Sequence, residues 1–173
     1  MPGLTGHRFF SQMKHLIAAF LVAFVQGTSH ADVIGGQVVG VTDGDTITLL
    51  DSYQRQHKIR LSGIDAPERK QAFGQRSREL LASLVFSKHV EVESDKKDRY
   101  GRTVGKVVFE GSDINLAMVA AGLAWHYKAY EEEQSLPDRI LYAKSENEAR
   151  SERRGLWVDP EPEAPWDWRH NGR

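Results

Sequence analysis

Residues 39–68, VGVTDGDTITLLDSYQRQHKIRLSGIDAPE, contain short segments in which apolar and polar residues alternate. The alternation covers residues 39–41, 46–49 and 57–61, and a period of two residues predicts half-buried β-strands. The Asp43-Gly44 turn separates the first two segments. Pro67 stops the third strand and disfavours helical geometry in the residue before it. The stretch therefore predicts three consecutive strands, the last of which ends in an acidic loop.

The pattern on the C-terminal side adds further strands and helices to this beginning. Apolar residues recur at helical spacing within residues 73–86, which predicts a helix directly after the third strand. Alternation at residues 89–93 and 102–109 predicts a fourth and a fifth strand. Capping residues predict two more helices, over residues 113–122 and 135–154.

This order of elements predicts the fold class. Five short strands with a helix after the third are typical of a Greek-key OB barrel, here an α+β protein with three helices. We expect one domain over residues 32–158 and a C-terminal tail over residues 159–173. The tail carries Pro160, Pro162 and Pro165, so we expect it to be extended. Whether Trp166 and Trp168 dock on the domain stays open.

Residues 1–31 have the features of a secretory signal peptide. Arg8 and Lys14 precede the apolar run LIAAFLVAFV, and Ser29 and Ala31 are small residues suited to signal-peptidase cleavage. The run is shorter than the ~20 apolar residues that a spanning helix needs. We therefore expect cleavage after Ala31 and a secreted or periplasmic protein. An uncleaved membrane anchor is the alternative.

The composition limits how the mature chain could bind nucleic acid. The chain has 173 residues and no cysteine, which excludes a disulfide framework and a thiolate metal site. Its 23 basic residues fall to 21 without Arg8 and Lys14, against 24 acidic ones, so the mature net charge is −3. A protein that coats nucleic acid through bulk positive charge would not have this balance. A polyanionic substrate would need specific arginines and a bound cation.

Three polar patches lie at predicted strand ends, at residues 43–46, 60–68 and 98–102. Hydrolysis of a phosphodiester requires a base for the attacking water and fixed positive charge for the phosphate oxygens. Asp45 and Asp65 are candidate ligands for a hard cation such as Ca²⁺ or Mg²⁺, which prefers oxygen donors. Zinc is not expected, because the histidines show no ligand spacing. The alternative for Asp43-Gly44-Asp45 is an ordinary hairpin turn without a metal.

The remaining candidates are a base and two arginines. Glu68 follows Pro67, which fixes the backbone before it, and is the candidate general base. Arg60 and Arg102 carry the planar fork that matches two phosphate oxygens. The alternative for Glu68 is a solvated loop residue, and for each arginine a surface salt bridge worth ~0–1 kcal/mol.

The motifs VTDGDT (residues 41–46), IRLSGIDAPE (59–68) and DRYGR (98–102), in this order, resemble the thermonuclease, or staphylococcal nuclease-like, family. The resemblance covers residues 37–157. It implies that Asp45, Asp65 and the carbonyl of Ala66 bind Ca²⁺. It also implies that Glu68 assists the attacking water and that Arg60 and Arg102 clamp the phosphate. The implied activity is an endonuclease that leaves 3′-phosphate and 5′-hydroxyl ends on DNA and RNA.

The match is not complete around the nucleotide. Arg99-Tyr100 stands where the family usually has Lys-Tyr, so the implied substrate contacts are Arg99, Tyr100 and, beyond the second helix, Tyr130. Asp43 is expected to orient water or arginine groups behind the ligands. We expect a monomer without a stable protein partner. The alternatives are a non-catalytic OB-fold module that binds single-stranded nucleic acid and a barrel that binds an oligosaccharide.

Overall fold

The computed structural model describes residues 32–172, so the predicted signal peptide lies outside the described residues. The main sheet has six strands, and its five long strands lie in the order β3-β2-β1-β5-β6, with β3 also paired in parallel with β6. This last pairing joins Ile59 to Thr103 and Leu61 to Gly105, and closes the sheet into a barrel. The strands are β1 (Asp32–Val41), β2 (Thr46–Leu50), β3 (Gln56–Leu61), β5 (His89–Lys97) and β6 (Thr103–Phe109). The predicted OB-type α+β barrel is confirmed.

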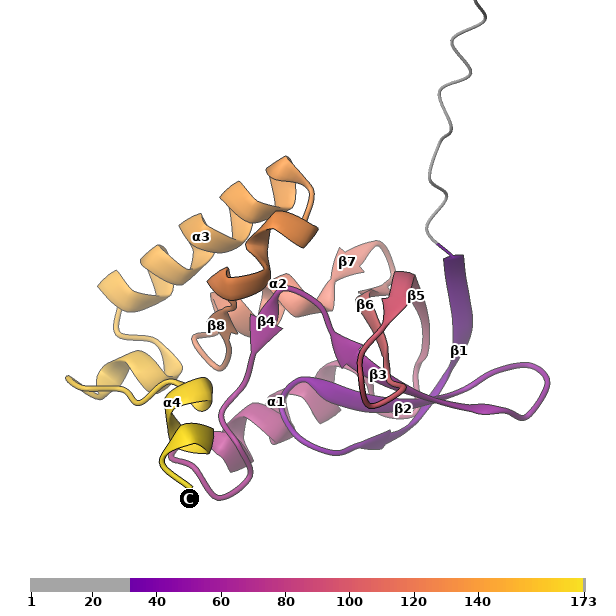
Figure 1. The fold of residues 1–173 in the computed structure, drawn as a ribbon, viewed down its shortest axis with the longest axis horizontal. Coiled ribbons are helices and arrows are strands. Elements are labelled where there is room, and N and C mark those ends of the chain that lie inside the picture. The colour runs from indigo at the N-terminus through magenta and orange to yellow at the C-terminus, as the bar shows by residue number, and fades with distance from the viewer. Residues whose placement is uncertain (1–31, 173) are drawn as a thin grey trace, which may run out of the picture.

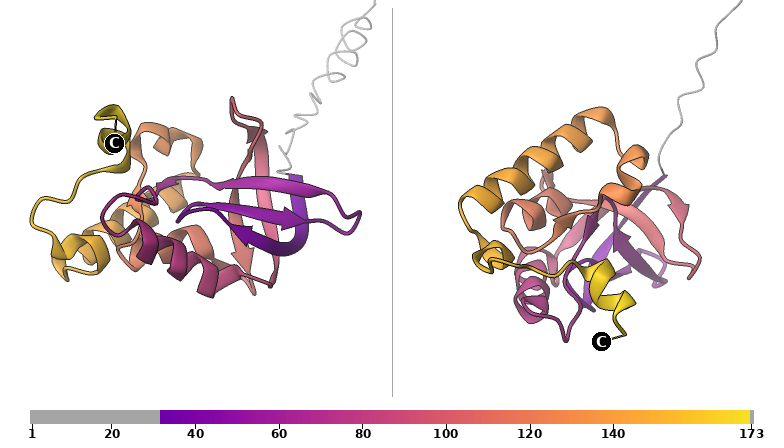
Figure 2. Two further views of the ribbon diagram at one scale, coloured as in Figure 1. Left: turned by 90° about the horizontal axis from the view of Figure 1, so that it is seen from below. Right: turned by 60° about the vertical axis from the view of Figure 1, so that its left-hand side comes forward.

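The predicted helices lie close to their expected positions. They are α1 (Gly74–Val85), α2 (Ile114–Ala120) and α3 (Leu136–Ser151). Asp113 caps α2 by accepting a hydrogen bond from the Leu116 amide, and Ser135 caps α3 through the Asp138 amide. Figures 1 and 2 show the helices gathered at one end of the barrel, with the β2–β3 hairpin projecting at the other.

The core accounts for the alternation of apolar and polar residues along the strands. Ile47 and Leu49 on β2 and Ile59 and Leu61 on β3 are at most 1% exposed. They pack in one cluster with apolar residues of α1 and α2, including Leu81. Each fully buried aliphatic side chain of this kind contributes roughly 1.5–3 kcal/mol to the hydrophobic term. The polar residues between them, among them Arg60, are left on the other face of their strands.

Several short elements were not predicted. They are β4 (Ile64–Asp65), β7 (Ser112–Asp113), β8 (Trp125–His126) and the 3₁₀ helices η1 (Lys128–Glu133) and η2 (Gly155–Val158). The strands β4 and β8 form a separate two-stranded sheet, in which Asp65 pairs with Trp125. This pairing holds the acidic loop that contains Asp65 against the segment that follows α2. Across residues 32–172, no helix combines the length and the apolar character needed to cross a membrane.

The C-terminal tail corrects two predictions. It is not extended throughout, because residues Pro165–His170 form a fourth helix, α4, in addition to the three that were expected. Proline is well suited to the first turn of a helix, where its missing amide hydrogen is not needed. Trp166 docks on the domain, with its ring stacked on Tyr127 at 5.4 Å between centroids. In Figure 1 the yellow α4 therefore lies against the body of the protein.

Candidate functional site

One cleft of about 990 Å³ collects the site residues predicted from the sequence. It is bordered by the turn before β2, the end of β3 with β4, the β5–β6 turn, η1 and α4. All ten predicted residues line it: Asp43, Asp45, Arg60, Asp65, Ala66, Glu68, Arg99, Tyr100, Arg102 and Tyr130. Side chains from three distant patches of the sequence thus face a common space.

Arg60 links the two predicted cation ligands. Its Nη1 lies 2.6 Å from Asp45 Oδ2 and its Nη2 donates to Asp65 Oδ1 at 2.8 Å. Both carboxylates are buried, and Asp45 Oδ2 also accepts from the Ala66 amide at 2.7 Å. Burial lowers the pKa of Arg60, but the charges of Asp45 and Asp65 outweigh it and raise that pKa above its ordinary value. Arg60 is therefore a fixed cation at the floor of the cleft.

The Nη1 atom of Arg60 is incompletely hydrogen-bonded. It is buried and forms an ion pair with Asp45 Oδ2 at 2.6 Å, but it makes no well-aligned hydrogen bond within residues 32–172. A buried N–H group without a well-aligned acceptor costs free energy, so Nη1 favours a ligand that can accept a hydrogen bond from it. An anionic oxygen in the cleft would meet this requirement.

Carboxylates are concentrated in one part of the cleft. Four carboxylates line the cleft near Arg60 and Arg169: Asp43, Asp45, Asp65 and Glu68. Burial, followed by the charge of Asp45, raises the pKa of Asp43 to about 7. Burial also raises the pKa of Asp65, while Arg169 and Arg60 act in the opposite direction. Such crowding of buried carboxylates favours a bound cation.

Gly44 brings Asp43 and Asp45 close to α1. A Cβ atom at this position would lie 1.8 Å from Ser77 Oγ and 2.8 Å from Ala66 Cβ. The turn can therefore approach the helix and the acidic loop only with glycine here. The glycine in this motif is thus required by packing, in addition to the turn chemistry that the sequence suggested.

Glu68 and Asp65 share a partner that the sequence did not predict. Arg169 of α4 donates from Nη1 to Glu68 Oε1 at 2.8 Å. The same guanidinium binds both oxygens of Asp65, at 3.2 Å from Nη1 to Oδ1 and 2.7 Å from Nη2 to Oδ2. The contacts join positions about a hundred residues apart. The only signal in the sequence was an arginine directly after the tryptophan pair of the tail.

The β5–β6 turn holds Arg102 in a defined position. Asp98 accepts hydrogen bonds from the amides of Tyr100 and Arg102, both at 2.9 Å, and from Arg102 Nε at 2.7 Å. The guanidiniums of Arg99 and Arg102 lie over the Tyr100 ring, 4.9 and 5.5 Å from its centroid. Tyr100 itself is 68% exposed, so one aromatic surface is available at the rim of the cleft.

A second aromatic group borders the opposite part of the cleft. The rings of Tyr127 and Tyr130 contact edge to face at 5.1 Å, and Trp166 stacks on Tyr127. Lys96 lies 5.7 Å from the Tyr130 ring centre. Tyr127 also lines the cleft, although the sequence did not single it out. Trp125 instead packs against Trp157 in a second small core.

The donor set suits a hard divalent cation. Within residues 32–172 no group of three or more carboxylate or histidine side chains is arranged to hold a metal by itself. Asp45 and Asp65 nevertheless provide adjacent buried carboxylates, and Asp43 and Glu68 line the same cleft. Ca²⁺ accepts irregular oxygen ligation that includes carbonyls and waters. The residues therefore fit such an ion, with part of its shell left to water or substrate.

Comparison with known proteins places the chain in a family. Residues 58–159 match the family described as Staphylococcal nuclease homologue. An "Uncharacterized endonuclease" of Escherichia coli is 45% identical over 91% of this chain and 99% of its own length. A "Micrococcal nuclease" of Shigella flexneri is 43% identical over 88% of this chain and 90% of its own length. An "Uncharacterized endonuclease" of Haemophilus influenzae is 41% identical over 77% of this chain and 71% of its own.

These matches agree with the barrel and with the order of the motifs along it. The chain belongs to the staphylococcal nuclease family.

Proposed function

We propose that the chain is a calcium-dependent endonuclease that hydrolyses phosphodiester bonds of DNA and RNA. The observation that carries the proposal is the position of Arg60. Its buried guanidinium is held between Asp45 and Asp65, with one nitrogen making no well-aligned hydrogen bond within the described residues. The cleft around it also contains Glu68 and Arg102. The names of the relatives, endonuclease and micrococcal nuclease, support the same class of reaction.

In the proposed reaction the two arginines bind the scissile phosphate from two sides of the cleft. Arg60 donates through Nη1, and Arg102, fixed by Asp98, adds the second guanidinium. Positive charge aimed at the oxygens of the transition state lowers the barrier because the extra negative charge develops there. A divalent ion held by Asp45, Asp65 and the Ala66 carbonyl would add positive charge and help orient the attacking water.

Glu68 takes a proton from that water. The water oxygen then forms a bond to phosphorus, and the bond from phosphorus to the 5′ oxygen breaks. The departing 5′ oxygen takes a proton from solvent, which leaves a 3′-phosphate and a 5′-hydroxyl. The exposed rings of Tyr100 and Tyr130, beside Arg99, offer surfaces on which bases of any sequence can stack.

The test uses the mature chain that begins at Asp32, with plasmid DNA, single-stranded DNA and RNA as substrates. Each substrate is incubated with Ca²⁺, with Mg²⁺ and with a chelator. We expect cleavage with Ca²⁺, loss of cleavage with the chelator, and ends that polynucleotide kinase labels without prior phosphatase treatment. Labelling that requires phosphatase would contradict the proposed direction of bond cleavage.

The role of Glu68 is tested by Glu68→Gln. Removal of a general base typically costs 10²–10⁴-fold in rate, so we expect turnover to fall by about that factor. Glu91→Gln is the matched control, because Glu91 is exposed on β5 and does not line the cleft. If Glu68→Gln binds a labelled oligonucleotide and still cuts it at the original rate, the base assignment fails. If the unaltered chain binds oligonucleotides but never cuts them, it is the non-catalytic module instead.

We also propose that the protein is exported to the periplasm or the medium. The support is the composition of residues 1–31. Fractionation of producing cells and mass spectrometry of the N-terminus are the tests. An exported chain beginning at Asp32 is expected, whereas a cytoplasmic chain retaining residues 1–31 would contradict export.

A further inference from the structure

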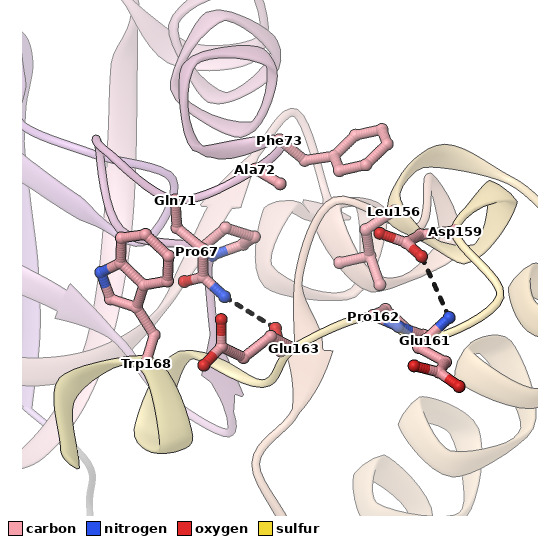
Figure 3. Close-up of a pocket in the computed structure, with 10 residues that line it drawn as sticks. All are labelled: Pro67, Gln71, Ala72, Phe73, Leu156, Asp159, Glu161, Pro162, Glu163 and Trp168. Carbon is pink, nitrogen blue, oxygen red and sulfur yellow. Dashed lines mark hydrogen bonds between the residues drawn. The ribbon is translucent and has the colours of Figure 1, made fainter. Parts of the chain in front are cut away.

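The helix α4 is seated on the domain by contacts of the residues that precede Arg169. Trp166 stacks on Tyr127 and meets Trp125 edge to face, each at 5.4 Å between centroids. Ahead of the helix, Gln71 Nε2 donates to the Glu163 carbonyl at 2.7 Å, as Figure 3 shows. Trp168 borders a separate cavity of about 180 Å³ against Pro67 and Gln71. The position of Arg169 is thus fixed by packing as well as by its ion pairs.

Arg169 binds the two side chains that the proposed function uses as cation ligand and as base. Its guanidinium binds both oxygens of Asp65, one of which Arg60 also binds, and it holds Glu68 Oε1. The side chain of Asp65 is 1% exposed, so its oxygens have little access to other partners. A cation ligated by Asp65 would lie next to the positive charge of Arg169, and like charges at such range repel one another.

We propose that residues 163–170 form a strap that closes over the site. In the closed state Arg169 supplies the positive charge beside Asp65 and Glu68, which a divalent cation supplies once it has bound. The inference rests on the proposed cation role of Asp65. Ca²⁺ and docked Arg169 then exclude one another, and binding of the ion releases the strap. Release frees Glu68 to accept a proton and opens the cleft beside Tyr127 to substrate.

This competition weakens the apparent affinity for Ca²⁺. The apparent Kd equals the intrinsic Kd divided by the fraction of molecules in which the strap is open. If about one molecule in ten is open, loss of Arg169 tightens binding about tenfold. A substitution that loosens the seat of the strap without changing charge acts in the same direction.

The test measures Ca²⁺ binding by calorimetry on the full mature chain, without substrate. We expect Arg169→Gln to bind Ca²⁺ about tenfold more tightly than the unaltered protein, and Trp166→Ala to bind it more tightly as well. Arg76→Gln is the matched control, because it removes the same charge from the exposed face of α1 outside the cleft. Hydrogen exchange of the amides of α4 should also speed up when Ca²⁺ is added to the unaltered protein.

The outcomes separate this inference from the proposed function. Equal Ca²⁺ affinity in the unaltered, Arg169→Gln and Trp166→Ala proteins, with unchanged exchange in α4, would overturn the strap. Absence of Ca²⁺ binding in all of them would overturn the cation assignment, and the strap with it. Tighter binding in Arg169→Gln and Trp166→Ala but not in Arg76→Gln would support the strap, whatever the protein cleaves.

Discussion

Replacing Asn115 with alanine tests how the barrel is kept closed beneath the site. Asn115 is fully buried at the start of α2. Its Oδ1 accepts from the Val107 amide at 3.0 Å, and its Nδ2 donates to the carbonyls of Ser62 and Gly105 at 3.0 and 3.2 Å. One side chain thus joins β6 to Ser62, which lies between Arg60 on β3 and Asp65 on β4.

The cost of the substitution can be worked out group by group. The Gly105 carbonyl keeps a second donor, the Ser62 amide at 2.8 Å, and so is not left unpaired. The Val107 amide and the Ser62 carbonyl lose the Asn115 partner, at about 1–3 kcal/mol for each buried group. Ser62 is only partly buried, so water can replace the amide there. We therefore expect a loss of about 2–3 kcal/mol in the free energy of unfolding.

Urea denaturation followed by circular dichroism measures this loss, and the melting temperature should fall by roughly 5–10 °C. Asn147→Ala, on the exposed face of α3, is the control and should change stability by less than about 0.5 kcal/mol. Because Arg60 and Asp65 depend on the same junction, nuclease activity at 25 °C should also fall in Asn115→Ala. A change in unfolding free energy below about 1 kcal/mol would refute the argument that the amide holds the barrel closed.

Three further predictions concern the turns and the cation. Asp51→Asn should destabilise the protein at pH 7, because hydrogen bonds from His57 and Arg55 hold the pKa of Asp51 below its ordinary value. The difference in unfolding free energy from the unaltered protein should shrink as pH falls below about 4. Urea titrations at pH 7 and pH 3 would check this. Gly44→Ala should cost about 1–3 kcal/mol by overpacking, and adding Ser77→Ala should recover part of the loss in thermal melts. Ca²⁺ at 100 times its Kd should add about 2.7 kcal/mol to the unfolding free energy; absence of any shift in melting temperature would contradict specific binding to the folded state.

The main strands could be predicted because they are half-buried. Ile47, Leu49, Ile59 and Leu61 alternate with polar residues, and the barrel buries this one face. The prediction was incomplete where tertiary contacts decide the structure. The strands β4 and β8 have only two residues each and exist through their mutual pairing, which no local pattern encodes. The helix α4 is held by Trp166 on Tyr127, which outweighs the preference of a proline-containing tail for an extended chain.

The location of the site followed from the same physical reasoning. Patches at strand ends gather on one side of a barrel, and all ten residues singled out from the sequence line the cleft. Their roles stay predictions. Arg169 could not be predicted, because an arginine in an acidic tail is ordinarily a solvated residue. Its contacts with Asp65 and Glu68 depend on where α4 docks, and that depends in turn on aromatic packing far along the chain.

The proposed strap and the proposed cation both neutralise the same cluster of carboxylates in the cleft. Four carboxylates beside one buried arginine would leave a large uncompensated charge in a site of low exposure, which is costly for a folded domain. Arg169 reduces that charge by one while it binds Asp65 and Glu68 Oε1, the groups to which the proposals assign the cation and the base. The proposed divalent ion would reduce it by two and leave Glu68 available. Under the two proposals, one cluster of carboxylates is neutralised in two alternative ways, of which only the second permits the proposed reaction.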